Sequence, residues 1–142
     1  MKTCLTMTIL SCALALGTSA LAAPGGAETC GTAHIEVFDK GGGSKNTTRF
    51  TMPLPRNRPG EIETRKGAVH HVIGVHCTAI NGNLATLKID FRRATHRPGK
   101  PGETLAFKVS SRIKTGKRVV IGKLHGRAQH VTVAATLVSD SR

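Results

Sequence analysis

The sequence predicts an all-β fold, which is an antiparallel β-sandwich or small barrel of seven to eight strands in one domain. Three observations predict this fold. Apolar and polar residues alternate with a period of two along most of the chain, and short turns rich in Gly, Pro and Asn separate the alternating runs. No run has the apolar spacing of an amphipathic helix. The length of 142 residues suits a single domain and excludes a multi-domain enzyme.

The first 22 residues are predicted to be a cleaved secretory signal peptide. Lys2 supplies a positive start, residues 5–16 form a short apolar core, and Ala20-Leu21-Ala22 is a small-x-small cleavage motif. The core is shorter than the about 20 apolar residues of a membrane-spanning helix, so no transmembrane segment is expected after cleavage. We therefore expect a periplasmic or secreted protein. The predicted domains are the signal peptide at 1–22, a flexible lead-in at 23–32 and a single β-domain at 33–142.

Two cysteines remain after cleavage, Cys30 and Cys77, because Cys4 and Cys12 belong to the signal peptide. In an oxidising compartment an even pair predicts one disulfide. Closing a loop of this length stabilises a fold by about 4 kcal/mol in the chain-entropy model. Two free buried thiols are the alternative.

Eight runs have the strand pattern, and each ends at a turn signal. They cover residues 33–38, 47–54, 61–66, 68–80, 84–93, 104–114, 118–124 and 130–138. The third run is the weakest of the eight. The seventh is apolar on both faces, at Val119, Val120 and Ile121, which predicts a central strand. Between the fifth and sixth runs, residues 95–102 are predicted to form a basic loop rich in Pro and Gly.

The turn Asn81-Gly82-Asn83 is the strongest hairpin signal in the chain. A two-residue turn would place apolar residues of one strand opposite polar residues of the other. A three-residue loop pairs apolar with apolar, so burial favours it. The pairs predicted in this way are Ile73 with Phe91, Val75 with Ile89, and Cys77 with Leu87. The opposite face then carries His70, Val72, His76, Lys88, Asp90 and Arg92.

The net charge of +13 is the strongest compositional signal, and the cations gather near turns. Two groups are predicted to contact phosphate or sulfate groups of a polyanion. One surrounds an expected tight hairpin and the other surrounds the 95–102 loop. The first group is Arg112, Lys114, Lys117 and Arg118, and the second is Arg92, Arg93, Arg97 and Lys100. The alternative is that the charge only keeps the protein soluble.

These features favour an exported, non-enzymatic binding or structural module of the cell envelope. Its expected partner is an anionic envelope polymer, lipid head groups or a protein. Nucleic acid is not expected as a partner, because single-strand binders stack bases on aromatic side chains and this chain has only four Phe, no Trp and no Tyr.

A metal-binding protein is the alternative hypothesis, with His70 and His76 as candidate ligands. On a strand these two lie about 20 Å apart, so a metal site needs histidines from neighbouring strands. His76 also faces Lys88 in the predicted register, which disfavours a cation. A small hydrolase is the third hypothesis. No nucleophile elbow of the Gly-x-Ser-x-Gly type and no phosphate-binding Gly-rich loop occurs, so we expect no catalytic residue, no enzyme activity and no cofactor.

Overall fold

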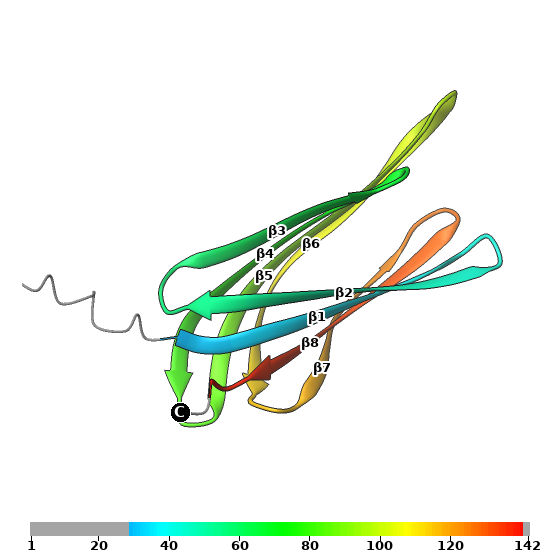
Figure 1. Cartoon of the computed structure of the whole chain (residues 1–142). Helices are drawn as coiled ribbons and strands as arrows, with labels where there is room; N and C mark the ends of the chain where they lie inside the picture. Colours follow the sequence, from blue (N-terminus) through cyan, green and yellow to red (C-terminus); the bar gives the residue numbers. More distant parts are fainter. Residues whose placement is uncertain (1–28, 141–142) are drawn as a thin grey trace, which may run out of the picture.

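The computed structural model describes residues 29–140, and this part of the chain contains eight β-strands and no helix (Figure 1). The strands are β1 (Thr29–Gly41), β2 (Ser44–Pro55), β3 (Pro59–Lys66), β4 (Val69–Asn81), β5 (Leu84–Arg97), β6 (Lys100–Lys114), β7 (Arg118–His125) and β8 (Gln129–Val138). They form two antiparallel sheets of four strands. Sheet A has the order β2-β1-β8-β7 and sheet B the order β3-β4-β5-β6. The prediction of an all-β sandwich is confirmed.

The core lies between the two sheets and is built from alternate residues of each strand. Ile35 and Val37 of β1 and Val133 of β8 are buried from sheet A, and Val75 and Phe91 are buried from sheet B. The period of two read from the sequence is therefore the physical period of the pleat, with one apolar face turned inward. None of the described residues belongs to a helix that could cross a membrane.

The predicted register between β4 and β5 is confirmed, since Ile73 pairs with Phe91 and Cys77 with Leu87. His71 lies on the predicted inward face and is only 4% exposed. The predicted three-residue loop is wrong. Asn81 pairs with Leu84, so the turn has two residues, Gly82 and Asn83, and a bulge between Cys77 and Ala79 takes up the extra residue. Bulges of this kind let a strand change register without losing its buried face.

Two predicted irregular segments are largely strand. β1 begins at Thr29, so the last residues of the predicted lead-in already pair with β2, beyond a register shift between Thr29 and Gly31. The predicted basic loop at 95–102 is too long. β5 and β6 stay paired as far as Arg97 and Lys100, so only Pro98-Gly99 forms the turn. The predicted signal peptide and the start of the lead-in lie outside the described residues.

The segment between β6 and β7 does not form the predicted hairpin. β6 belongs to sheet B and β7 to sheet A, so Thr115-Gly116-Lys117 crosses from one sheet to the other. The prediction that β7 is central is also wrong, because β8 returns to pair with β1 and leaves β7 at the edge. Val120 of β7 is accordingly 46% exposed.

The sandwich is closed at one end and splayed at the other (Figure 1). Near the closed end a disulfide joins Cys30 of β1 to Cys77 of β4, with their Cα atoms 6.4 Å apart, and so links the two sheets covalently. The predicted disulfide is thus present. At the opposite end, called the open end below, the sheets diverge. The open end carries the β1–β2, β3–β4, β5–β6 and β7–β8 turns.

Candidate functional site

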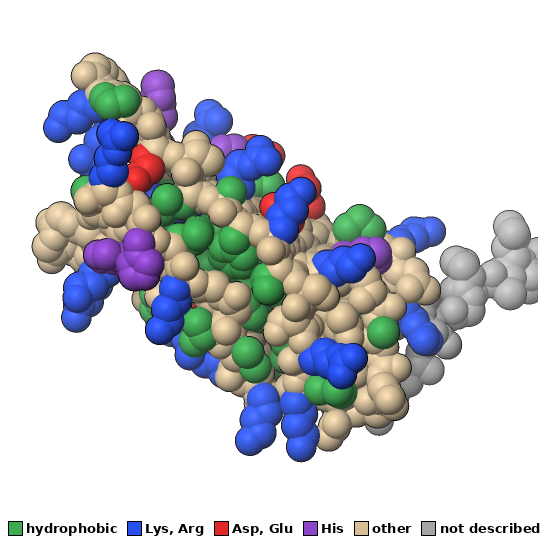
Figure 2. All heavy atoms as spheres, turned by 180° about the vertical axis from the view of Figure 1, so that it is seen from behind, with side chains coloured by type: hydrophobic (Ala, Val, Ile, Leu, Met, Phe, Trp, Pro, Cys, Tyr) green, Lys and Arg blue, Asp and Glu red, His purple; other side chains and the backbone are tan. Residues whose placement is uncertain are grey.

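The structure distributes the eight cations of the predicted anion contacts over several parts of the molecule. Arg92 and Arg112 are exposed on sheet B. Arg112 pairs with Thr86, six residues before Arg92 on β5, so the two arginines lie about 20 Å apart along the sheet. They cannot contact one small anion together. Figure 2 agrees with this spread, since Lys and Arg side chains are scattered over the whole visible face.

The cations of the β6–β7 crossover also separate. Lys114 and Lys117 flank the crossing turn, in which the Lys117 N–H donates to the Lys114 carbonyl at 3.0 Å. Arg118 turns away onto sheet A, where its Nε donates to Glu36 Oε2 at 2.8 Å. The expected hairpin tip is therefore a connection between sheets, and one of its four cations is engaged by an acid.

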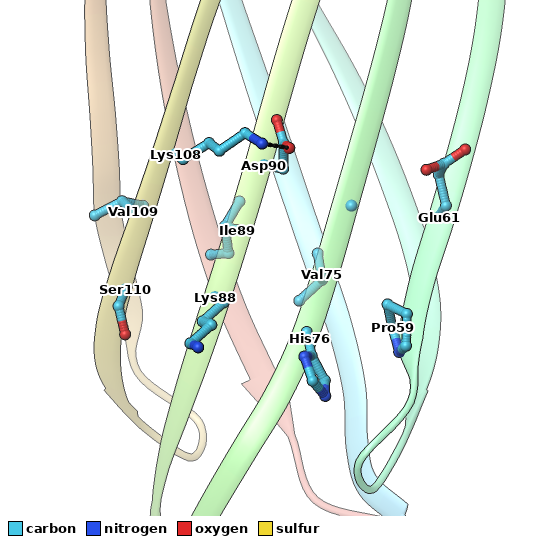
Figure 3. A pocket seen from close by; sticks show the side chains of 11 residues that line it. Pro59, Glu61, Val75, His76, Lys88, Ile89, Asp90, Lys108, Val109 and Ser110 are labelled. Atoms are coloured by element: carbon cyan, nitrogen blue, oxygen red, sulfur yellow. Dashed lines mark ion pairs between the residues drawn. The ribbon is translucent and has the colours of Figure 1, made fainter.

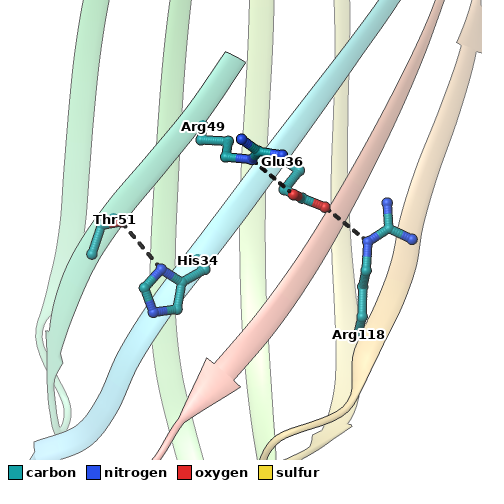
Figure 4. A network of polar contacts seen from close by, with 5 residues as sticks. All are labelled: His34, Glu36, Arg49, Thr51 and Arg118. Atoms are coloured by element: carbon teal, nitrogen blue, oxygen red, sulfur yellow. Dashed lines mark hydrogen bonds and ion pairs between the residues drawn. The ribbon is translucent and has the colours of Figure 1, made fainter. Parts of the chain in front are cut away.

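Glu36 is the centre of a polar network on sheet A (Figure 4). Arg118 donates to one carboxylate oxygen, and Arg49 donates to the other at 3.1 Å. The Arg118 guanidinium also lies 5.1 Å from the centre of the Phe38 ring. These hydrogen bonds, that from Arg118 first and that from Arg49 second, hold the pKa of the Glu36 carboxyl below its ordinary value of 4.5.

A lowered pKa in the folded state makes the contribution of Glu36 to stability pH-dependent. The contribution is complete above the pKa of the unfolded chain and is lost as the pH falls through the lower pKa of the folded chain. We therefore expect the Tm of the wild-type protein to fall more between pH 6 and pH 3 than that of Glu36→Gln. Thermal unfolding followed by circular dichroism measures both curves. Parallel curves would contradict the role given to Glu36.

Three polar residues form a buried charge cluster between the sheets, namely Asp39, His71 and Arg93. Arg93, predicted as a surface contact, is only 3% exposed, and its Nε lies 2.8 Å from Asp39 Oδ1. His71 Nε2 lies 3.7 Å from the other carboxylate oxygen. The His71 ring packs between Phe50 and Phe91, with ring centres 5.8 and 6.2 Å away. Since Asp39 belongs to β1 and the other two to sheet B, the cluster connects both sheets.

The buried charge cluster leaves hydrogen-bonding capacity unused. Arg93 Nη1 is buried and has no hydrogen-bond partner among residues 29–140, and the same holds for the nearby Gln129 Oε1. The contact from Arg93 Nε to Asp39 is short but lacks the alignment of a hydrogen bond, so it acts as a charge contact. Buried donors without partners are rare in folded proteins and call for an explanation.

Beside this cluster a cavity of about 380 Å³ opens at the open end of the sandwich. We call it the open-end cleft. It is lined by polar residues of both sheets, including Asp39, Ser44, Asn46, Arg93, Arg97 and Gln129. Two residues of the second predicted group, Arg93 and Arg97, thus line the cleft, and a third, Lys100, is paired with Arg97 at the β5–β6 turn.

Each of the four turns at the open end carries cationic side chains. A row of basic residues crosses sheet A at this end, because Lys45 pairs with Lys40, Lys40 with His130, and His130 with His125. All four are exposed. Lys40 and Lys45 are like charges placed opposite each other, which weakens the pairing of β1 with β2 at this point. The sequence alone did not indicate the row, since it depends on the order of strands in the sheet.

A second depression, of about 470 Å³, lies on sheet B where Gly74 has no side chain (Figure 3). Gly74 stands between Glu61 of β3 and Asp90 of β5 in register. Lys108 lies 3.0 Å from Asp90 and forms an ion pair with it. Two acids, Glu61 and Asp90, balance two lysines in this depression, whereas one acid stands against two arginines in the open-end cleft, so the cleft is better suited to an anion.

The histidines predicted as alternative metal ligands have other neighbours. His70 Nε2 lies 2.6 Å from Glu63 Oε1, and His76 is opposite Lys88 as predicted. Between Thr29 and Asp140, no group of three or more His, Cys, Asp or Glu side chains has an arrangement that could hold a metal ion. His70 and His76 therefore do not come together with a third ligand in the described part of the chain.

Fold and site define a disulfide-linked β-sandwich with a polar cleft at its open end. Comparison with models of known protein families, with curated proteins and with solved structures finds no match to this chain. The function is therefore argued from the cleft and its charges.

Proposed function

We propose that this protein is an exported, non-enzymatic binding module of the cell envelope, and that its open-end cleft holds an anionic group of an envelope polymer or lipid head group. The observation that carries the proposal is Arg93 Nη1, a buried cationic donor without a partner beside a polar cavity. A buried guanidinium costs free energy unless its donors are satisfied, and a phosphate or carboxylate would satisfy this one.

The surroundings of the cleft support an anion as the ligand. Arg97 lines the same cavity, and Lys100 is its partner across the turn. Lys40 and Lys45 stand next to the cleft on β1 and β2. These cations outnumber Asp39, the acid that lines the cleft, and a cleft with an excess of one sign of charge concentrates ligands of the opposite sign. Ser44, Asn46 and Gln129 add neutral hydrogen-bonding groups of the kind that contact hydroxyl groups of a sugar.

Export is part of the proposal and rests on two supports. The predicted signal peptide at residues 1–22 directs the chain out of the cytoplasm. The disulfide between Cys30 and Cys77 is a bond that persists in oxidising compartments. Intact mass spectrometry of the exported protein tests both, since cleavage and oxidation each change the mass by a known amount.

Binding to anionic envelope material in a series of salt concentrations tests the function. Lipopolysaccharide and anionic liposomes are the probes, with neutral liposomes as the reference. Reversing the charge of Arg97 and Lys100 to Glu is expected to weaken binding and to reduce the slope of log K against log salt by about one unit for each lost contact.

The matched control reverses Lys114 and Lys117, which makes the same change in net charge at the closed end. This control is expected to retain most of the binding. A larger loss in the Lys114/Lys117 variant would place the contact at the crossover turn and contradict the cleft. Equal binding to neutral and anionic liposomes would show that the charge serves solubility alone.

A further inference from the structure

His125 and His130 form a close pair on sheet A, at the ends of β7 and β8. They are directly opposite each other in the strand register. Their Nδ1 atoms lie 2.6 Å apart, and their ring centres are 4.8 Å apart. Both side chains are exposed, and neither lines the open-end cleft. The two imidazoles therefore share a hydrogen bond between their Nδ1 atoms, at a position that solvent can reach.

Convergent imidazole nitrogens are the ligands that Cu²⁺, Ni²⁺ and Zn²⁺ accept in proteins. The separation of the nitrogens distinguishes the geometries. With metal–nitrogen bonds of about 2.0 Å, adjacent ligands lie about 2.8 Å apart in a square-planar site and about 3.3 Å apart in a tetrahedral one. The 2.6 Å between the two nitrogens is a hydrogen-bond distance, and it must widen by less to reach the square-planar value than the tetrahedral one when a metal ion replaces the shared proton. Cu²⁺ prefers that geometry and also has the highest affinity in the series.

We propose that His125 and His130 form a two-histidine site that binds Cu²⁺ more tightly than Ni²⁺ or Zn²⁺, with water completing the coordination. The site is a different arrangement from the His70 and His76 hypothesis, because its two ligands lie side by side on neighbouring strands. It does not depend on the ligand of the open-end cleft.

The charges around the pair act in both directions. Lys40 is opposite His130 on β1, and its charge opposes a bound cation. Glu103 of β6 reaches over the β7–β8 turn, where its Oε1 accepts a hydrogen bond from the Arg127 N–H at 2.9 Å, and its carboxylate favours a cation nearby. Removing the charge at Lys40 should therefore tighten metal binding.

Titration of the mature, disulfide-bonded protein with each metal ion tests the proposal. Calorimetry gives the affinities, and electron paramagnetic resonance of the Cu²⁺ complex reports coupling to two nitrogens. We expect His125→Asn and His130→Asn each to lower the Cu²⁺ affinity about tenfold or more, and Lys40→Gln to raise it. Thermal unfolding without metal is expected to stay nearly unchanged in these variants, because the residues are exposed.

The amino terminus of any chain also binds Cu²⁺, so the comparison is made between variants that share one terminus. His34→Asn and His96→Asn are the controls, since these histidines are exposed and lie on other strands. They are expected to bind Cu²⁺ like the wild type. Unchanged affinity in His125→Asn, an equal loss in His34→Asn, or tighter binding of Zn²⁺ than of Cu²⁺ would overturn the proposal.

Discussion

Replacing Asp39 with Ala is expected to lower the free energy of unfolding by about 3–5 kcal/mol. The change leaves Arg93, which is 3% exposed, as an uncompensated charge between the sheets. Asp39 itself is 14% exposed, so some water reaches the pair and the lower end of this range is expected. Urea denaturation at pH 7 measures the effect, provided the slope of free energy against urea stays the same.

A double variant separates two effects of Asp39→Ala, which are the loss of the ion pair with Arg93 and the cost of leaving the Arg93 charge buried without a partner. Replacing Asp39 with Ala and Arg93 with Met removes both charges, and apolar replacements of buried ion pairs are often neutral or stabilising. We expect the double variant to be more stable than Asp39→Ala alone. If Asp39→Ala lowers the free energy of unfolding by less than about 1 kcal/mol, water solvates Arg93 in the cleft. Arg93 Nη1 would then not support an anion site.

The same double variant connects stability with the proposed function. Arg93→Met removes the donor that the cleft offers to an anion, so lipopolysaccharide binding is expected to weaken while the fold recovers. A variant that is stable and still binds at full strength would show that Arg97 and Lys100 hold the anion without Arg93.

Local pattern was sufficient to predict the strands and the pairing of β4 with β5. Placing Ile73 opposite Phe91 buries both, and a slip of one residue would expose the whole face, so burial selects one register. The turn could not be predicted in the same way, because the bulge beyond Cys77 changes the loop length and turns Ile80 rather than Ala79 toward the core.

Topology was not contained in local pattern. A strand, a Gly-containing turn and another strand look the same whether the chain folds back in one sheet or crosses to the other, and β6 and β7 do the latter. The pairing of Asp39 with Arg93 depends on that global arrangement, since the two residues come from different sheets. Arg93 was predicted as a surface cation for this reason. Its position two residues after Phe91 on an inward face was the signal that could have indicated burial.

Removing the disulfide with Cys30→Ala and Cys77→Ala is expected to lower the free energy of unfolding by about 4 kcal/mol. The bridge spans 47 positions, and most of its effect in the chain-entropy model comes from restricting the unfolded chain. Urea denaturation with and without a reducing agent measures it. The reducing agent should destabilise the wild type and leave the double variant unchanged. A wild type that ignores the reducing agent and titrates two thiols would contradict the bridge.

The disulfide and the buried charge cluster hold the two sheets together at different places. Cys77 is opposite Leu87, and Leu87 precedes Arg93 by six residues on β5, so the two links lie about 20 Å apart. Effects of mutations at this separation usually add. Combining Asp39→Ala with the loss of both cysteines should then cost about 7–9 kcal/mol, which approaches the whole stability of a domain of this size. We therefore expect the triple variant to be largely unfolded at 37 °C and each parent variant to stay folded, as measured by circular dichroism. A folded triple variant would mean that the apolar core between the sheets is sufficient without either link.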